Sequence, residues 1–153
     1  MIDVIDLKKT FGDLEVLKGI NVTINKGDIV VVIGPSGSGK STFLRCLNCM
    51  EDPTSGSIIF NGVDIADMRV DINIHRRHMG MVFQHFNLFN NMTVIENIMM
   101  APVYVRCKEL KKAKRKGTLA PDAPKTKAEI KAQARAEALE LLRRIGLEDK
   151  ADV

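Results

Sequence analysis

The sequence lacks several features that would assign it to a class at once. It has no tryptophan, one tyrosine and three cysteines among 153 residues. No apolar run approaches the roughly 18–20 residues that cross a bilayer, and the first residues, Met1-Ile2-Asp3-Val4, lack the basic and then apolar order of a secretory signal. We therefore expect a chain that folds in water, in the cytosol.

The cysteines do not indicate a disulfide framework, because their number is odd and no export signal precedes them. Cys46 and Cys49 form a C-x-x-C pair, which can hold zinc or carry redox chemistry. No second pair and no histidine at zinc-finger spacing follows, and the pair falls inside an expected helix. We interpret Cys46, Cys49 and Cys107 as reduced thiols, packed rather than reactive.

The histidines are not a better metal site. His75 and His78 lie three residues apart and His85 follows soon after. No carboxylate or further histidine completes a tetrahedral set around them, so we do not assign them as ligands.

The composition is that of one soluble globular domain, with 45% hydrophobic and 27% charged residues. The net charge of +4 is local: seven of the eleven residues 106–116 are lysine or arginine, and Glu109 is the only acid among them. Such a run can meet anionic lipid or nucleic acid, but it is more often a solvated surface segment. We favour the solvated segment and expect no nucleic-acid partner.

Hydrophobic patterning predicts strands early in the chain. Residues 2–7 are one candidate, and residues 20–24 alternate as a strand with one wet face does. Residues 29–33, Ile-Val-Val-Val-Ile, form an unbroken β-branched run, which is typical of a strand covered on both faces in a mostly parallel sheet. Residues 79–83 predict another short strand.

A hairpin is predicted just beyond the first helix. Asn61-Gly62 separates the apolar runs 57–60 and 63–65, and both turn positions tolerate positive φ.

Helices are predicted in three places. Residues 40–50 follow a glycine-rich loop and end before Pro53. The capping box Thr93-x-x-Glu96 opens a helix over residues 94–100, which Pro102 limits. A second capping box, Thr126-x-x-Glu129, opens an amphipathic helix that ends at Gly146, with helically spaced apolar residues at Ile130, Ala134, Ala138, Leu141, Leu142 and Ile145. Between the last two we expect a loop insertion, over residues 106–125.

The glycine-rich loop carries the clearest chemistry. It matches G-x-x-x-x-G-K-[ST] and lies after an expected buried strand and before a helix. Glycines let successive N–H groups turn toward phosphate oxygens, and the helix N-terminus adds partial positive charge. Lys40 is predicted to reach the β and γ phosphates of ATP, Ser41 to bind Mg²⁺ and Thr42 to support the helix start. The loop consists of Gly34, Pro35, Ser36, Gly37, Ser38, Gly39, Lys40 and Ser41.

The segments around the loop follow one another in a recognisable order. They are Phe11-Gly12, residues 16–20, residues 44–48, Pro53-Thr54-Ser55-Gly56, Gly80-Met81-Val82-Phe83-Gln84 and Asn87-Leu88-Phe89. In this order they resemble the ATP-binding subunits of ABC transporters, specifically those of bacterial importers for polar amino acids. The resemblance implies an α/β P-loop NTPase fold, with an N-terminal antiparallel β subdomain and the P-loop core at residues 1–92 and the start of an α-helical subdomain at residues 93–153.

The resemblance also implies roles for single residues. Phe11 matches the aromatic that stacks on adenine, with Val16 flanking the base, and an ordinary core residue of the β subdomain is the less favoured alternative for Phe11. Gln84 matches the glutamine that contacts Mg²⁺ and the attacking water, for which an uncharged amide is suited. Catalytic roles therefore fall to Lys40 and Gln84, and metal binding to Ser41 and Gln84.

The second half of the family pattern does not occur in these residues. The signature Leu-Ser-Gly-Gly-Gln, a strand ending in Asp-Glu and a later histidine are all missing, so the chain resembles about the first three-fifths of such a subunit. We expect an incomplete fold and a weak or inactive ATPase in isolation.

Two functions fit these residues. The first is the ATP-hydrolysing subunit of an amino-acid importer, peripheral on the cytoplasmic face of the bacterial membrane. Its implied partners are transmembrane permease subunits, a second ATP-binding subunit and, indirectly, a solute-binding protein. The second is a nucleotide-binding module without turnover.

Overall fold

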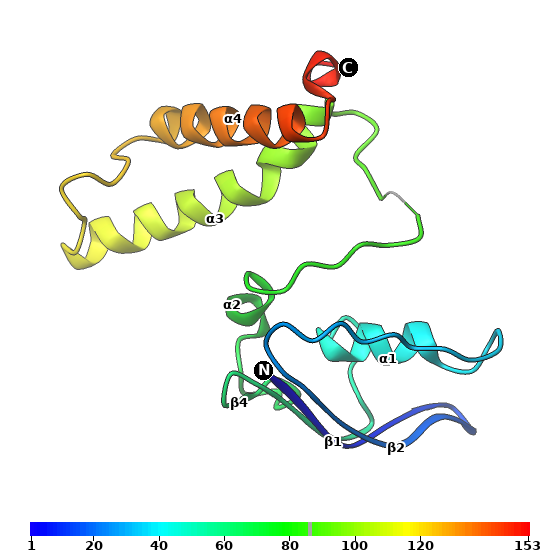
Figure 1. Cartoon of the computed structure of the whole chain (residues 1–153). Helices are drawn as coiled ribbons and strands as arrows, with labels where there is room; N and C mark the ends of the chain where they lie inside the picture. Colours follow the sequence, from blue (N-terminus) through cyan, green and yellow to red (C-terminus); the bar gives the residue numbers. More distant parts are fainter. Residues whose placement is uncertain (86) are drawn as a thin grey trace. The chain divides into compact units, whose positions relative to one another are not determined.

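The computed structural model describes residues 1–85 and 87–153, which form two compact units, Met1–Val82 and Phe83–Val153. Each unit is described by itself (Figure 1).

The first unit is built on an antiparallel sheet in the order β2-β1-β3-β4. Strands β1 (Ile2–Phe11) and β2 (Leu14–Ile24) form a long hairpin, while β3 (Ser55–Phe60) pairs with the other edge of β1. Ile2 lies opposite Ile24 on one side and Phe60 on the other. The predicted strands at residues 2–7 and 20–24 are confirmed, and both are longer than the patterning indicated.

The predicted hairpin after Ser57 is also confirmed. Strand β4 (Val63–Asp64) returns along β3, and the two turn residues take left-handed conformations, with φ of 48° at Asn61 and 83° at Gly62. Asparagine and glycine reach that region at low cost, which is why this pair specifies the turn.

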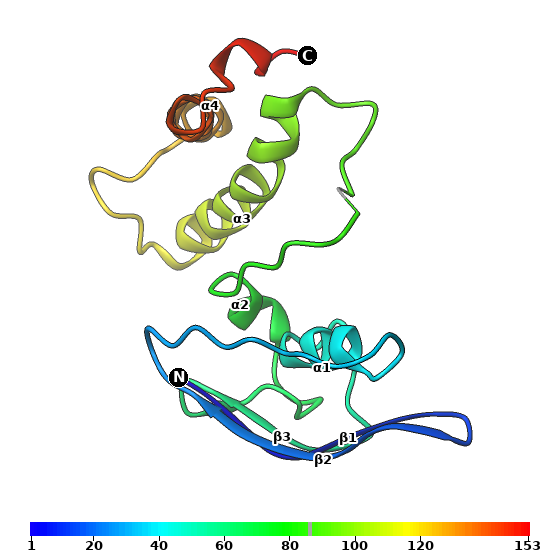
Figure 2. The same ribbon diagram turned by 45° about the vertical axis from the view of Figure 1, so that its right-hand side comes forward.

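Helix α1 (Lys40–Leu47) lies over one face of the sheet, as Figure 2 shows. Its Phe43 and Cys46 are buried in one cluster with Leu7, Leu17 and Ile58 from the strands. The helix ends at Leu47, earlier than predicted, because the chain leaves helical geometry at Asn48.

The paired cysteines belong to this core, as the packed-thiol interpretation predicted. Cys46 and Cys49 are free and buried, and the Cys49 Sγ donates to the Ile65 carbonyl at 3.2 Å. Burial raises the pKa of Cys49 to about 11, so its thiol stays protonated and unreactive at neutral pH.

Two predicted strands are wrong. Residues 29–33 form no strand, and the side chains of Ile29, Val31 and Ile33 are 94%, 76% and 87% exposed. Residues 79–83 form no strand either, and Val82 is fully open to solvent. A continuous apolar run becomes a buried strand only if other strands and helices cover it. No strand within the described ranges 1–85 and 87–153 pairs with either segment.

A short helix that the patterning did not indicate, α2 (Ile72–Arg76), follows the sheet. The Asp71 carboxylate caps it by accepting from the Asn73 N–H. Arg76 donates to the carbonyls of Asn48 and Cys49, and so satisfies backbone groups just beyond α1.

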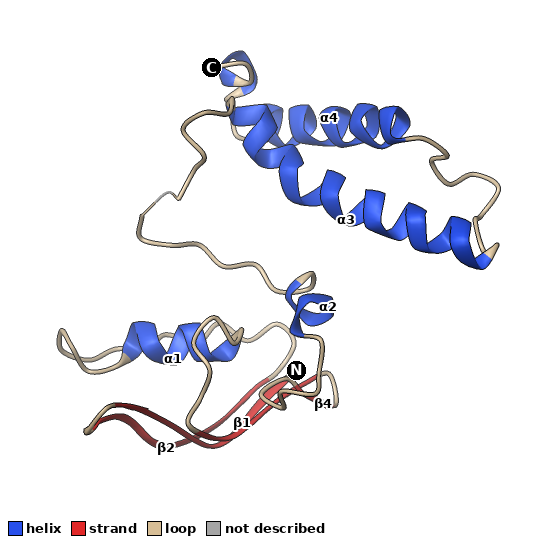
Figure 3. Cartoon of the chain, turned by 180° about the vertical axis from the view of Figure 1, so that it is seen from behind, coloured by secondary structure: helices blue, strands red, loops and turns tan. Residues whose placement is uncertain are grey.

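The second unit is a helical hairpin, seen from behind in Figure 3. Helix α3 (Val94–Lys116) starts at the predicted capping box, in which Thr93 and Glu96 exchange both hydrogen bonds. It does not end at Pro102, which lies inside the helix. Proline removes one helical hydrogen bond, but the packing of α3 against α4 offsets this loss.

The expected loop insertion at 106–125 is therefore wrong over its first half. Residues 106–116 continue α3, and the helix ends at Gly117, whose φ is 65°. Lysine, arginine, leucine and alanine are all good helix formers, so local propensity supports this extension even without strong apolar periodicity.

Helix α4 (Lys127–Arg144) begins at Thr126, as predicted, with the Thr126 hydroxyl accepting from the Glu129 N–H. Ile130, Ala134, Ala138 and Leu142 are buried along one side, which confirms these four positions of the predicted apolar face. The prediction is wrong for Leu141 and Ile145, which are exposed at the C-terminal end of the helix. Ile95 of α3 packs against this face together with Ala151, just beyond the short 3₁₀ helix η1 (Glu148–Lys150). Within the described residues, no helix is long and apolar enough to cross a membrane.

Gly56 offers a direct test of the sheet. Its φ is 95°, and a Cβ there would lie 2.4 Å from the Asp6 carbonyl oxygen of the neighbouring strand. We expect Gly56→Ala to lower the free energy of unfolding by about 3 kcal/mol in urea denaturation, because backbone strain and a steric clash combine.

Gly62→Ala is the matched control, since φ is 83° there but no atom lies within 4 Å of the added Cβ. It should cost about 1 kcal/mol. Equal costs for the two variants would contradict the described pairing of β3 with β1.

Candidate functional site

The glycine-rich loop, residues 34–41, runs directly into α1. Gly39 is the N-cap residue of this helix and has φ of 92°. A Cβ at this position would lie 2.9 Å from the Val16 Cγ1 and 3.3 Å from the Val16 carbonyl oxygen on β2. The start of α1 can approach the sheet this closely only with glycine at position 39.

The loop curls around the side chain of Lys40. The Lys40 Nζ donates to the carbonyl oxygens of Gly34 at 2.9 Å and Pro35 at 2.7 Å. The Ser38 N–H donates to the same Pro35 carbonyl, which tightens the turn. The ammonium group is thus held at the mouth of the loop by neutral acceptors, which an anionic phosphate oxygen can replace with stronger hydrogen bonds.

The first turn of α1 has no competing acceptor. Gly39 has no side chain to cap the helix, and no acidic residue lies in the first turn. A Cβ at Gly37 would meet no atom within 4 Å, so the space beside this residue of the loop is open. Free backbone N–H groups, the positive end of the helix and the Lys40 cation fit the phosphate groups that the motif implies.

Two hydroxyl residues follow Lys40. Ser41 is exposed in the first helical turn and Thr42 is half-buried beside it. The position of Ser41 next to the loop is compatible with a hydroxyl ligand to Mg²⁺, and this role remains a prediction.

Phe11 lies at the tip of the β1–β2 hairpin, opposite Leu14, and its side chain is 45% exposed. It does not belong to the buried cluster of the first unit, so the alternative of an ordinary core residue does not describe it. Val16, which is half-buried, lies farther along β2 and close to Gly39, where an added Cβ would come within 2.9 Å of its Cγ1. The structure therefore brings Val16 to the loop and leaves the ring of Phe11 accessible.

Lys9 is a neighbour of Phe11 that the sequence analysis missed. Its Nζ lies 4.7 Å from the Phe11 ring centroid and also pairs with the Glu51 carboxylate at 2.6 Å. Side chains two residues apart on a strand share a face, so the Lys9-x-Phe11 spacing was the available signal. Phe11 is 45% exposed, so part of its ring stays accessible beside this cation.

Gln84 is exposed and belongs to the second unit, whereas the loop belongs to the first. Its predicted contacts with Mg²⁺ and water therefore remain a prediction. Among the described residues no group of three histidine, cysteine or acidic side chains could hold a metal ion. His75 instead packs edge-on against Phe60, with ring centroids 6.3 Å apart.

The sheet, the helix and the loop together have the arrangement of the P-loop class of proteins. A family model described as ABC transporter matches residues 17–153. The chain belongs to the ABC transporter family.

Two curated relatives of this chain are named as transport ATP-binding proteins for amino acids. The arginine transport ATP-binding protein ArtM of Bacillus subtilis is 48% identical over 150 residues, which cover 98% of this chain and 54% of that protein. The glutamine transport ATP-binding protein GlnQ of Geobacillus stearothermophilus is 54% identical over 99 residues, covering 65% of this chain and 41% of its own length. The chain spans about half the length of the curated relatives it matches.

Solved structures support the fold. A dimeric bacterial ABC transporter cassette is 25% identical, with a TM-score of 0.61, and the match covers all of this chain and 86% of that one. An ATP-binding subunit of an ABC transporter gives a TM-score of 0.65 at 22% identity, covering 99% of this chain and 53% of that chain. The α/β P-loop NTPase fold class predicted from the sequence is confirmed.

Lys40→Ala tests the site. We expect it to weaken MgATP binding roughly 100-fold in isothermal calorimetry, because it removes the cation that meets the phosphates. Arg45→Ala is the control, since it removes one exposed positive charge from the last turn of the same helix. Equal affinities in wild type and Lys40→Ala would defeat the assignment of the site.

Proposed function

We propose that this chain provides the ATP-binding part of an importer for polar amino acids and couples ATP binding and hydrolysis to uptake. The observation that carries the proposal is the phosphate loop, whose Lys40 cation is held by two backbone carbonyls beside an uncapped helix start. The relatives cited above are named as transport ATP-binding proteins for arginine and glutamine, which supports the class of solute.

In this proposal ATP binds with Mg²⁺. The phosphates take the place of the Gly34 and Pro35 carbonyls as partners of Lys40, while the N–H groups of the loop donate to their oxygens. Adenine stacks on the open face of Phe11, with Val16 at its edge. Ser41 ligates Mg²⁺, and Gln84 contacts the metal and the attacking water.

In this proposal the chain contains parts of two subdomains of the cassette. We assign residues 1–92 to the β subdomain and P-loop core, and residues 93–153 to the start of the helical subdomain. We place the whole subunit on the cytoplasmic face of the cell membrane, bound to permease subunits, paired with a second copy of itself and indirectly served by a solute-binding protein. One structural neighbour, the bacterial ABC transporter cassette cited above, is dimeric, which supports the pairing.

The second unit offers a surface suited to the permease. A groove of about 500 Å³ lies between α3 and α4, apolar along α3 and basic along its rim on α4. A short amphipathic segment of the permease fits this chemistry, with apolar side chains in the groove and acidic ones at the rim. Its lining consists of Met92, Ile95, Glu96, Met99, Met100, Val103, Tyr104, Cys107, Lys127, Lys131 and Arg135.

Nucleotide binding without turnover is the second candidate. It is favoured by the exposed apolar segment at residues 29–33, since a segment that is not part of the sheet cannot position catalytic groups next to the loop. The two candidates differ in whether the permease stimulates phosphate release.

Met100→Lys tests the importer directly. Met100 lines the groove but does not pack in the buried cluster of the second unit. The variant is made in a chain that includes any coding sequence found downstream of Val153. We expect it to keep its ATP affinity. It should lose permease-stimulated phosphate release about tenfold, because a cation enters an apolar contact.

Ala132→Lys on the exposed side of α4 adds the same charge outside the groove and should behave as wild type. If the wild-type chain binds MgATP but the permease does not stimulate its phosphate release, this result would support the second candidate instead. Equal stimulation of wild type and Met100→Lys would rule out the groove as the docking site.

A further inference from the structure

The basic run becomes an ordered feature once it lies on a helix. Lys108, Lys111, Lys112 and Arg115 occupy positions i, i+3, i+4 and i+7 of α3, so they share one side of the helix. All four are exposed. We call these four residues the basic stripe.

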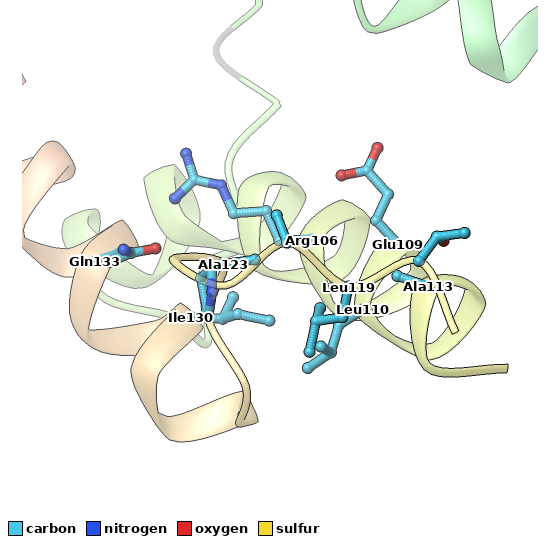
Figure 4. A pocket seen from close by; sticks show the side chains of 11 residues that line it. Arg106, Glu109, Leu110, Ala113, Leu119, Ala123, Ile130 and Gln133 are labelled. Carbon is cyan, nitrogen blue, oxygen red and sulfur yellow. The ribbon is translucent and has the colours of Figure 1, made fainter. Parts of the chain in front are cut away.

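Over the same turns, the opposite side of α3 faces α4 and the loop that connects the two helices. Arg106, Glu109, Leu110 and Ala113 repeat the i, i+3, i+4, i+7 spacing and line a pocket of about 390 Å³ next to α4. Figure 4 shows Leu110 beside Leu119 of the connecting loop, with Ile130 of α4 on the same side of α3. The inward side is thus fixed by packing, and the basic stripe is directed outward from the second unit.

The basic stripe differs from the inward side of α3 in its ion pairs within the described residues. Arg106, on the inward side, pairs with Glu137 at 2.6 Å, and this contact raises its pKa. No ion pair in the part of the chain that the structure describes engages any of the four stripe residues. Four cations within two turns of one helix produce a concentrated positive field that is open to solvent.

An aromatic side chain extends the basic stripe. Tyr104 lies one turn before Lys108 on the same side of α3, and its side chain is 68% exposed. It is the single tyrosine of the sequence. Tyrosine favours the headgroup level of a bilayer, where its ring is shielded and its hydroxyl is hydrated.

We propose that the basic stripe, with Tyr104, is a docking surface for the anionic headgroups of a lipid bilayer. Clusters of four or more cations on one side of a helix attract anionic lipid, and each cation adds to the attraction. The inference rests on the proposed function in one respect, which is that a membrane lies beside the protein. The contact between the basic stripe and lipid does not involve the nucleotide site. The stripe would hold the second unit against the membrane surface next to the permease.

Vesicle flotation of the whole chain tests this proposal. We expect binding to phosphatidylcholine vesicles that contain phosphatidylglycerol, no binding to phosphatidylcholine alone, and release by high salt because exposed charges are screened. Replacing the four stripe residues by glutamine should weaken binding to the anionic vesicles roughly 100-fold. Glutamine keeps the helix propensity of lysine, and circular dichroism checks that helicity is unchanged.

The matched control removes four exposed lysines elsewhere, Lys18, Lys26, Lys125 and Lys150, also by glutamine. It leaves the same net charge and should retain most of the vesicle binding. Equal loss in the two variants would show that net charge alone acts, which overturns the proposal. Stripe-dependent binding to an RNA or DNA oligonucleotide without binding to anionic vesicles would also overturn it.

A double variant, Lys108→Gln with Arg115→Gln, keeps the test valid if the fourfold variant loses helicity. It removes the two ends of the basic stripe and should weaken vesicle binding by roughly tenfold. MgATP affinity, measured in the same preparations, should not change in any of these variants. Loss of vesicle binding with intact ATP binding therefore separates this inference from the proposed function.

Discussion

The close contact between the start of α1 and strand β2 at Gly39 is the constraint on which the site depends. A Cβ at this position would lie 2.9 Å from the Val16 side chain, so only glycine lets the helix begin against the sheet. The same residue leaves the first turn of α1 without a side-chain cap. Packing and function are linked here, because the contact that seats the helix also leaves its N–H groups open to phosphate.

The position of Lys40 follows from that geometry. Its ammonium group folds back onto the Gly34 and Pro35 carbonyls at 2.9 and 2.7 Å, so the loop is closed on itself by its own cation. In the proposed function, a bound triphosphate would replace these two carbonyls. Lys40 and the backbone N–H groups of the loop would then donate to the same ligand. In the proposed function, the new hydrogen bonds from Lys40 to phosphate must therefore outweigh the two carbonyl contacts that they replace.

The sequence predicted local features well and long-range ones poorly. The Asn61-Gly62 turn, the Thr93 cap and the apolar face of α4 depend on neighbouring residues, and all three are present. Residues 29–33 were predicted as a buried strand, but burial depends on distant segments, and no described strand pairs with them. Lys9 above Phe11 was missed because its other contacts, with Glu51 and Asp52, lie more than forty residues away.

The central claim is that the loop binds phosphates, and amide chemical shifts test it most directly. We expect inorganic triphosphate with Mg²⁺ to shift the NMR signals of the Gly37, Gly39 and Lys40 amides as MgATP does, while adenosine leaves them unchanged. The shifts should be confined to the loop and the first turn of α1. Adenosine shifting these amides as strongly as MgATP, or triphosphate leaving them unmoved, would contradict the account.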